Sequence, residues 1–321
     1  MRLKYGEKFL EEIFPNMISS IFEKQNNVFL LKCLLTQRIE YSKAKRIAYI
    51  RVCLTLSFFI FSVIANIFTC DLLSSICGLF AVIIIVVNKY TSIQIKNQKK
   101  HAAAIQQYVD VSLYSEIAQG DKSEWGDLPA KSEVIQSISK YDCTDLSEFR
   151  NWYNDYSSFS SEYQIFYSQK ENIRWSDNLL KSYFCFLIFI SAVATILSFG
   201  IFILFNPSLI KFLAVCSWIV PIIEYTATNC MAIKKNLHTF TNICNYCNEI
   251  EKQLPSANSA KIKKKLIKLQ YKIRTSREES FLVPDWFYQL LKKSQQKNED
   301  RIANIMAEEN TRKEGSHESK N

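Results

Sequence analysis

Glycine, histidine and glycine-rich nucleotide-binding motifs are scarce in this chain. Six glycines and three histidines occur in 321 residues, and neither G-x-G-x-x-G nor G-x-x-x-x-G-K-[ST] is present. The missing glycine motifs exclude a glycine-rich nucleotide-binding α/β domain. His101, His238 and His317 are too scattered for a catalytic triad, an H-E-x-x-H motif or a zinc site. The sequence therefore predicts a protein that is not an enzyme and needs no metal or cofactor.

Cysteine is also too sparse for a secreted disulfide scaffold. The chain holds ten cysteines, far below the density of small disulfide-rich domains. At least five lie inside apolar segments: Cys53, Cys77, Cys185, Cys216 and Cys230. We expect the cysteines to be reduced. Cys244 and Cys247 have C-x-x-C spacing, but a single pair on a helix is more typical of packing than of redox or metal chemistry.

Four long apolar runs account for most of the 48% hydrophobic residues. They are Ile50–Thr69, Leu72–Val87, Tyr183–Phe205 and Leu209–Ile233. A hydrocarbon core of about 30 Å takes about 20 helical residues, so three runs are long enough, and the second spans only if Asn88 and a snorkelling Lys89 are included. The short connectors within each pair of runs predict two antiparallel hairpins. The expected fold is an all-α integral membrane protein with four transmembrane helices.

The basic residues beside these runs predict the orientation. Lysine and arginine flank the outer ends of both predicted hairpins, whereas Lys211 is the only basic residue near the hairpin tips. By the positive-inside rule, both termini and residues 89–182 are expected to be cytoplasmic. Met1–Gln25 carries charges throughout and lacks a continuous apolar region, so no signal peptide is expected.

The helical pattern continues from the predicted spans into the cytosol. Apolar spacing predicts a helix over Asn27–Ile47 that runs into the first span, and a helix from the second span to Gly120. Gly120–Pro129 is expected to be a loop. Further helices are predicted over Lys131–Lys140, Asp145–Tyr156, Ser160–Lys181, Ala260–Ser276 and Asp285–Ala307, with Asp145 as an N-cap.

These expectations divide the chain into six segments. They are a cytosolic N-terminal helical segment 1–49, a transmembrane hairpin 50–88, a cytosolic helical stalk and insertion 89–182, a second hairpin 183–233, basic cytosolic helices 234–307 and a disordered tail 308–321. The segment 234–321 holds eighteen basic and eleven acidic residues, which gives +7 of the net charge of +9. Such a segment is attracted to anionic lipid. An anionic ligand such as a nucleotide is the second interpretation, and long nucleic acid is not expected because no groove-reading motif accompanies the lysines.

Polar residues within the apolar runs suggest a pore. Glu224 follows Pro221 in an apolar segment, where a carboxylate is costly unless it faces a bundle interior, a water-filled cavity or the interface. In the first interpretation, Asn66, Thr195 and Glu224 line an oligomeric pore. In the second, the true span is Leu209–Ile223 and Glu224 lies among the cytoplasmic headgroups.

Several cytosolic segments combine arginine or lysine with aromatic and amide side chains. Gln37, Tyr41 and Lys45 recur at helical spacing and can share one face. Guanidinium groups beside tryptophan and tyrosine suit a ligand with phosphates and bases, through bidentate hydrogen bonds and stacking. The alternative is hydrogen bonding between helices within a stalk. The candidate ligand-binding residues are Arg38, Tyr41, Lys45, Gln169, Asn172, Trp175, Arg274, Arg277 and Trp286.

The order of these segments around the four runs resembles the SMODS-associating four-transmembrane effector family. The segments that carry the resemblance are Leu35–Lys45, Ala104–Asp110, Asn151–Tyr153, Gln169–Asp177, Leu269–Arg277 and Val283–Tyr288, and the similarity covers roughly Asn26 to Glu299. The resemblance implies a membrane effector of bacterial anti-phage defence, encoded beside a cyclic-oligonucleotide synthase.

Such an effector senses a cyclic oligonucleotide in the cytosol, oligomerises and permeabilises the bacterial inner membrane, which causes abortive infection. The expected partners are the lipid bilayer, the cyclic oligonucleotide and further copies of the chain. Two other classes stay open from the residues alone. One is a constitutive ion channel or transporter that uses Glu224, and the other is a membrane scaffold that binds a protein partner.

Overall fold

The protein is all-α in the part of the chain that its computed structural model describes, residues 20–67, 71–118, 121–141, 145–205 and 209–318. The structure describes the side chains of these residues, except in the outer turns of the long helices, mainly 58–82 and 201–222, and in 313–318. The α-helices are α2 (Ile21–Lys24), α3 (Val28–Ile67), α4 (Asp71–Ile117), α5 (Lys131–Ile138), α6 (Ser161–Phe205), α7 (Leu209–Gln253), α8 (Ser259–Glu279) and α9 (Asp285–Glu318), with 3-10 helices η1 (Lys122–Trp125) and η2 (Ser147–Phe149).

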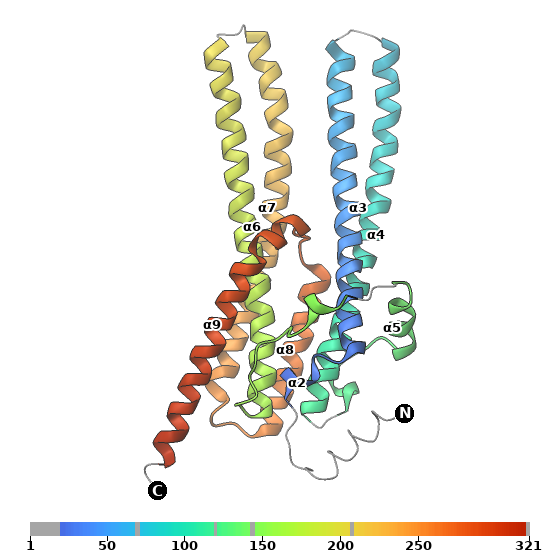
Figure 1. Cartoon of the computed structure of the whole chain (residues 1–321). Helices are drawn as coiled ribbons and strands as arrows, with labels where there is room; N and C mark the ends of the chain where they lie inside the picture. The colour runs from blue at the N-terminus through green and yellow to red at the C-terminus, as the bar shows by residue number, and fades with distance from the viewer. Residues whose placement is uncertain (1–19, 68–70, 119–120, 142–144, 206–208, 319–321) are drawn as a thin grey trace.

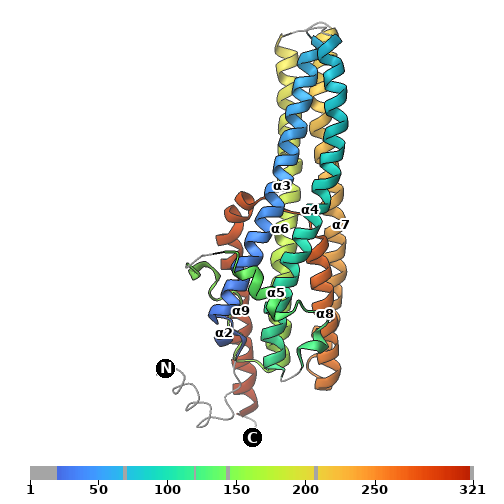
Figure 2. The ribbon, with the colours of Figure 1, turned by 90° about the vertical axis from the view of Figure 1, so that its right-hand side faces the viewer.

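Two pairs of long helices form the frame of the molecule. Helix α3 packs along α4, and α6 packs along α7, while their outer ends project away from the remaining elements (Figures 1 and 2). The other helices gather around the inner halves of the two pairs (Figure 1). The continuous helices α3, α4 and α6 confirm the prediction that helices run from the polar segments into the apolar runs without a break.

The outer halves of these helices expose large apolar side chains. Leu54, Val86, Phe189, Leu197 and Ile223 are all exposed. Within the described residues, one helical stretch, Ser161–Leu197, is both long and apolar enough to cross a membrane, and only 17% of its most apolar window is buried. Its side chains therefore face outward instead of filling a protein core. Contiguous exposed apolar surface of this kind marks a protein or membrane interaction site.

The core lies at the inner end, around α4. Ile105, Val109 and Leu113 are almost fully buried on α4, which contacts α3, α6 and α8 there. Phe166 of α6 and Leu266 of α8 complete this apolar core. The same stretch of α4 also buries polar side chains, so the packing is maintained by hydrogen bonds as well as by apolar contact.

The predicted helix over Asp145–Tyr156 is wrong. This segment contains only η2, and the Asp145 side chain accepts a hydrogen bond from the Ser147 backbone at 3.0 Å, which forms a turn instead of capping a longer helix. The chain then runs across the inner core. The Tyr153 backbone N–H donates to the Gln25 side chain at 2.7 Å, and Tyr153 and Tyr156 are buried. Tertiary contacts thus replace the helical hydrogen bonds that local spacing predicted.

The C-terminal helices begin where the sequence indicates. The Asn258 side chain accepts from the Ala260 backbone at 2.9 Å and starts α8, and Pro284 precedes α9. Helix α9 continues beyond the predicted end at Ala307, so the segment expected to be disordered is helical up to Glu318. Asn310 donates to the Ser158 carbonyl at 3.2 Å, which attaches this extension to the segment before α6. The expected loop Gly120–Pro129 contains the short helix η1.

Candidate functional site

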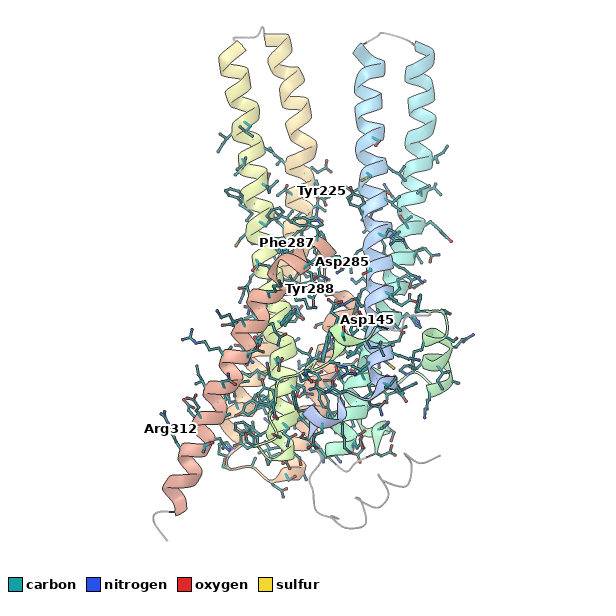
Figure 3. All side chains as sticks on the ribbon, viewed as in Figure 1. Asp145, Tyr225, Asp285, Phe287, Tyr288 and Arg312 are labelled. Carbon is teal, nitrogen blue, oxygen red and sulfur yellow. The ribbon has the colours of Figure 1, made fainter. Side chains whose placement is uncertain are left out.

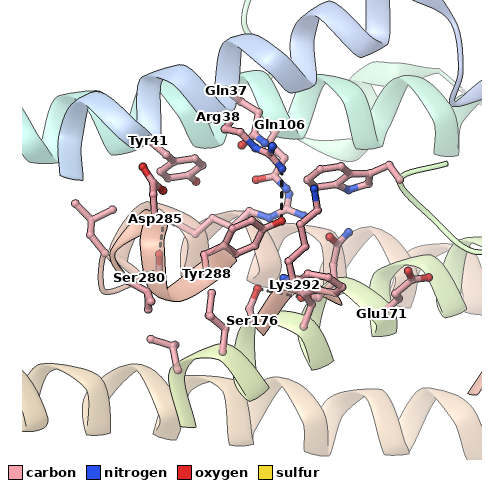
Figure 4. Close-up of a pocket in the computed structure, with 18 of the residues that line it drawn as sticks. Gln37, Arg38, Tyr41, Gln106, Glu171, Ser176, Ser280, Asp285, Tyr288 and Lys292 are labelled. Carbon is pink, nitrogen blue, oxygen red and sulfur yellow. Dashed lines mark hydrogen bonds between the residues drawn. The ribbon is translucent and has the colours of Figure 1, made fainter. Parts of the chain in front are cut away.

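A pocket of about 280 Å³ opens between the inner ends of the two long helix pairs. Its walls come from α3, α4, α6, α7, α8, α9, the segment around η2 and the connector between α8 and α9. Figure 4 shows Arg38 and Tyr41 of α3 facing Tyr288 and Lys292 of α9 across it. Side chains that are distant in sequence therefore share one cavity.

The most aromatic part of the pocket surrounds Arg38. Its guanidinium lies 4.6 Å from the ring centroid of Phe149 and 5.7 Å from that of Tyr288. The ring centroids of Trp175 and Tyr288 are 6.3 Å apart. A cation between aromatic faces, with a tryptophan nearby, provides both stacking surface and positive charge. Burial raises the pKa of Tyr288, so its hydroxyl stays protonated and can donate a hydrogen bond.

The pocket cations are held by carboxylates that are half exposed. Glu148 pairs with Arg38 at 2.8 Å and with Lys292 at 2.5 Å, and Asp285 pairs with Lys45 at 2.6 Å. Pairs of this exposure contribute roughly 0 to 1 kcal/mol. An incoming phosphate can therefore replace these carboxylates as the partner of the cations at small energetic cost.

Glu171 is a different kind of acid because it is almost fully buried at the edge of the pocket. It accepts hydrogen bonds from Tyr156 at 3.2 Å and from the Asn154 side chain at 3.1 Å. Burial, opposed by the hydrogen bond from the Asn154 backbone N–H and assisted by the charge of Glu299, raises the pKa of Glu171 to about 7. Its charge thus changes near neutral pH.

This raised pKa predicts a pH-dependent stability. Between the ordinary value of 4.5 and about 7, folded Glu171 keeps a proton that the unfolded chain has lost. The free energy of unfolding therefore falls as pH rises through this window, by roughly 3 kcal/mol at most, and the loss stays constant above it. In Glu171→Gln, thermal unfolding in detergent should show a weaker dependence on pH between 5 and 8 than in the wild type.

A matched control is Glu162→Gln on the same helix. The pKa of Glu162 is lowered, chiefly by the hydrogen bond from Ser259, so its titration lies below the pH window and its replacement should leave the slope unchanged. Equal slopes in the wild type and Glu171→Gln would contradict the assignment.

A buried polar network lies against the pocket. Asp110 of α4 pairs with Arg277 of α8 at 2.6 Å, and its other oxygen accepts from the Tyr153 hydroxyl at 2.6 Å. Gln270 donates to Asp110 at 3.0 Å and accepts from Gln169 at 3.1 Å. This network joins α4, α6, α8 and the segment that precedes α6.

Arg277 belongs both to this network and to the pocket. Only 9% of it is exposed, and its Nη2 atom has no hydrogen-bond partner in the described part of the chain. Burial disfavours the guanidinium charge, but Asp110 outweighs this effect and the pKa of Arg277 is raised. A buried donor without a partner is costly. Since Arg277 also lines the pocket, its guanidinium adds positive charge to the pocket wall.

The pocket contains six of the nine candidate ligand-binding residues that were selected from the sequence. That these residues bind a ligand stays a prediction. The six are Arg38, Tyr41, Lys45, Asn172, Trp175 and Arg277. Three others lie elsewhere. Gln169 is fully buried in the network, Arg274 pairs with Glu278 and donates to the Asp127 carbonyl, and Trp286 lines a second cavity.

The predicted pore residues are not brought together by any described contact. The Thr195 hydroxyl donates to the Ser191 carbonyl of its own helix at 2.8 Å, and Glu224 is exposed on α7. The side chain of Asn66 lies outside the described residues.

The described cysteines are free thiols. Burial raises the pKa of Cys247 to about 12 and also raises that of Cys244. Low thiolate content makes both poor nucleophiles and poor metal ligands. Among the described residues, no cluster of histidine, cysteine and acidic side chains has the arrangement of a metal site.

Sequence reasoning missed several pocket residues on α9. Asp285, Tyr288 and Lys292 recur at i, i+3 and i+7, so they share a helix face. The same spacing argument that selected Tyr41 and Lys45 would have selected them. Glu148 and Glu171 had no comparable signal, since their positions depend on the irregular segment before α6 and on burial.

Together, the long paired helices and the exposed apolar outer halves define a membrane-associated helical protein, whose inner end contains a cationic, aromatic pocket. Residues 19–308 match the SMODS-associating 4TM effector domain, and the chain belongs to this family. The resemblance drawn from the sequence is therefore confirmed. No curated protein and no solved structure matches. The family comprises four-transmembrane effectors associated with SMODS cyclic-oligonucleotide signalling, so the chain is a membrane protein.

Proposed function

We propose that this protein is a membrane effector of bacterial anti-phage defence that binds a cyclic oligonucleotide in the cytosol. The observation that carries the proposal is a pocket that presents the Arg38 guanidinium beside aromatic rings, together with Trp175 and Arg277. Phosphate oxygens supply the acceptors that guanidinium groups need, and bases stack on tryptophan and tyrosine. This chemistry matches the ligand class that the family's signalling context supplies.

The helices α3, α4, α6 and α7 are proposed to cross the inner membrane as two antiparallel hairpins, with both termini in the cytoplasm. The exposed apolar side chains of their outer halves support this placement. So does the distribution of lysine and arginine along the sequence, which is concentrated at the inner side. The pocket then lies in the cytosol, where it is accessible to a soluble messenger.

Ligand binding is proposed to shift the chain toward an oligomer that permeabilises the membrane and causes abortive infection. Asp285 of α9 pairs with Lys45 and accepts a hydrogen bond from Ser42 at 2.8 Å, both on α3. A phosphate that takes Lys45 from Asp285 would loosen α3 from α9. A ligand can shift a conformational equilibrium only by such a difference in contacts.

The test is dye release from liposomes that contain the purified protein, with and without a panel of cyclic di- and trinucleotides. Release that depends on one nucleotide supports the effector and identifies its messenger. Ion flux without any nucleotide, lost in Glu224→Gln, would favour a constitutive channel or transporter instead. No leak with any nucleotide, from protein shown to be inserted, would contradict the proposal and favour a scaffold.

The Asp285 contacts predict a variant that is partly active without ligand. Asp285→Ala removes the acceptor that holds Ser42 and Lys45, so the resting arrangement should lose up to about 1 kcal/mol. We expect basal dye release to rise about two- to fivefold. The control is Glu308→Ala, an exposed acid on the same helix. Basal release that is equal in both variants would show that this contact does not restrain the resting state.

A further inference from the structure

A second, larger cavity lies beside the pocket, on the side of the membrane-facing helix halves. It has a volume of about 1070 Å³ and is lined by α3 and α4 on one side and by α6, α7, the end of α8 and the start of α9 on the other. Lys45, Phe281 and Asp285 line both cavities and form the wall between them. Figure 3 shows Tyr225 of α7 further toward the outer helix ends than Asp285 and Tyr288.

The cavity has an excess of positive charge, because six basic side chains line it against three acids, Glu278, Glu279 and Asp285. Arg46, Lys96, Lys99 and Lys235 line it, and none of them has an ion-pair partner in the described part of the chain. Burial lowers the pKa of Lys99, and the charge of Glu279 offsets this only partly. Of these four, only Lys99 is partly buried, where an unpaired charge is costly, while Arg46, Lys96 and Lys235 are exposed. These side chains therefore favour an anion between the two helix pairs.

The rim of the same cavity is aromatic and apolar. Tyr49, Tyr225 and Trp286 line it with 71%, 42% and 57% of their surfaces exposed. Tyrosine and tryptophan are enriched at the level of lipid headgroups, where one end of the ring is apolar and the other is hydrated. The exposed apolar side chains of α3 and α7, such as Leu54 and Ile223, lie further out on the same helices. The cavity thus presents cations inward and lipid-compatible surface outward.

We propose that this cavity binds the headgroup of an anionic phospholipid from the cytoplasmic leaflet. The phosphate is held by Lys96 and Lys99 of α4 together with Lys235 of α7, and the acyl chains continue along the outer halves of the helices. Basic pockets between transmembrane helices on the cytoplasmic side bind such headgroups in general. The inference depends on the proposed membrane placement, but it does not depend on the messenger. A bound lipid would bridge the two helix pairs beside the wall that contains Asp285.

The test is native mass spectrometry of the full-length protein in a neutral detergent, titrated with phosphatidylglycerol. We expect saturable binding of phosphatidylglycerol and no saturable binding of phosphatidylcholine. In Lys96→Ala/Lys99→Ala the affinity should fall about thirtyfold, which corresponds to about 2 kcal/mol at roughly 1 kcal/mol per lysine near the headgroup. The control with the same change in charge is Lys261→Ala/Lys264→Ala on α8, whose two lysines are exposed and lie outside the cavity.

Three results would overturn the lipid site. An equal loss of affinity in the α8 control would mean that the lipid binds through diffuse charge, and equal competition by glycerol phosphate would mean that the cavity takes a soluble phosphate. Insertion is measured separately by carbonate extraction of membranes. Failed insertion would contradict the proposed function, whereas normal insertion without phosphatidylglycerol binding would contradict only the lipid site.

Discussion

Replacing Arg277 by alanine is expected to lower the free energy of unfolding by about 3 to 5 kcal/mol, because a buried ion pair loses one of its partners. The substitution leaves the Asp110 carboxylate buried with 1% of its side chain exposed and without its cation. Tyr153 and Gln270 would still donate to Asp110, but hydrogen bonds alone do not neutralise the charge. Thermal unfolding in detergent measures the loss.

A double-mutant cycle separates this charge effect from lost packing. Asp110→Asn keeps an acceptor for Tyr153 and removes the charge, so Arg277→Ala should cost about 2 kcal/mol less in that background. The matched single control is Arg274→Ala, whose ion pair with Glu278 leaves 22% and 24% of the two side chains exposed and should contribute about 1 kcal/mol. If Arg277→Ala costs no more than Arg274→Ala, the buried pair does not stabilise the fold.

The long helices could be predicted from the sequence because their signals are local. Asn27–Ile47 contains no proline or glycine, and its apolar spacing continues into the following run. The segment Asp145–Tyr156 has comparable helical spacing, yet apart from the short helix η2 it has an irregular backbone. The Tyr153 backbone N–H of this segment donates a hydrogen bond to Gln25, which lies more than a hundred residues away. No local sequence pattern indicates this contact.

The candidate site was only partly predictable for the same reason. Helical spacing correctly grouped Tyr41 and Lys45, which both line the pocket. Arg274 and Arg277 are three residues apart and would share a helix face by the same spacing, but the structure turns Arg274 toward the Asp127 carbonyl and buries Arg277 against Asp110. Spacing shows that two residues share a face and does not show what packs against that face. The pairing of Asp110 with Arg277 depends on how α4 meets α8.

Because Arg277 also supports the fold, the messenger is better tested through Arg38 and Trp175. In Arg38→Ala, Glu148 keeps its contact with Lys292, so little stability should be lost. The variant removes a charge-assisted hydrogen bond to phosphate of about 1.5 to 3 kcal/mol. Trp175→Ala removes a stacking surface of about 1 to 3 kcal/mol per base. The nucleotide concentration for half-maximal dye release should therefore rise roughly tenfold to a hundredfold in each variant.

Controls of the same residue type or size make this loss specific. Arg301→Ala removes an exposed guanidinium from α9 outside the pocket, and Tyr271→Ala removes an exposed ring from α8, so both should keep the wild-type dose response. Arg38→Lys retains the charge but not the planar fork of donors, and an intermediate shift is expected. A normal dose response in both Arg38→Ala and Trp175→Ala would place the messenger outside this pocket. A shift in Arg38→Ala and Trp175→Ala, without a shift in the controls, means that the messenger binds in the pocket between the two helix pairs.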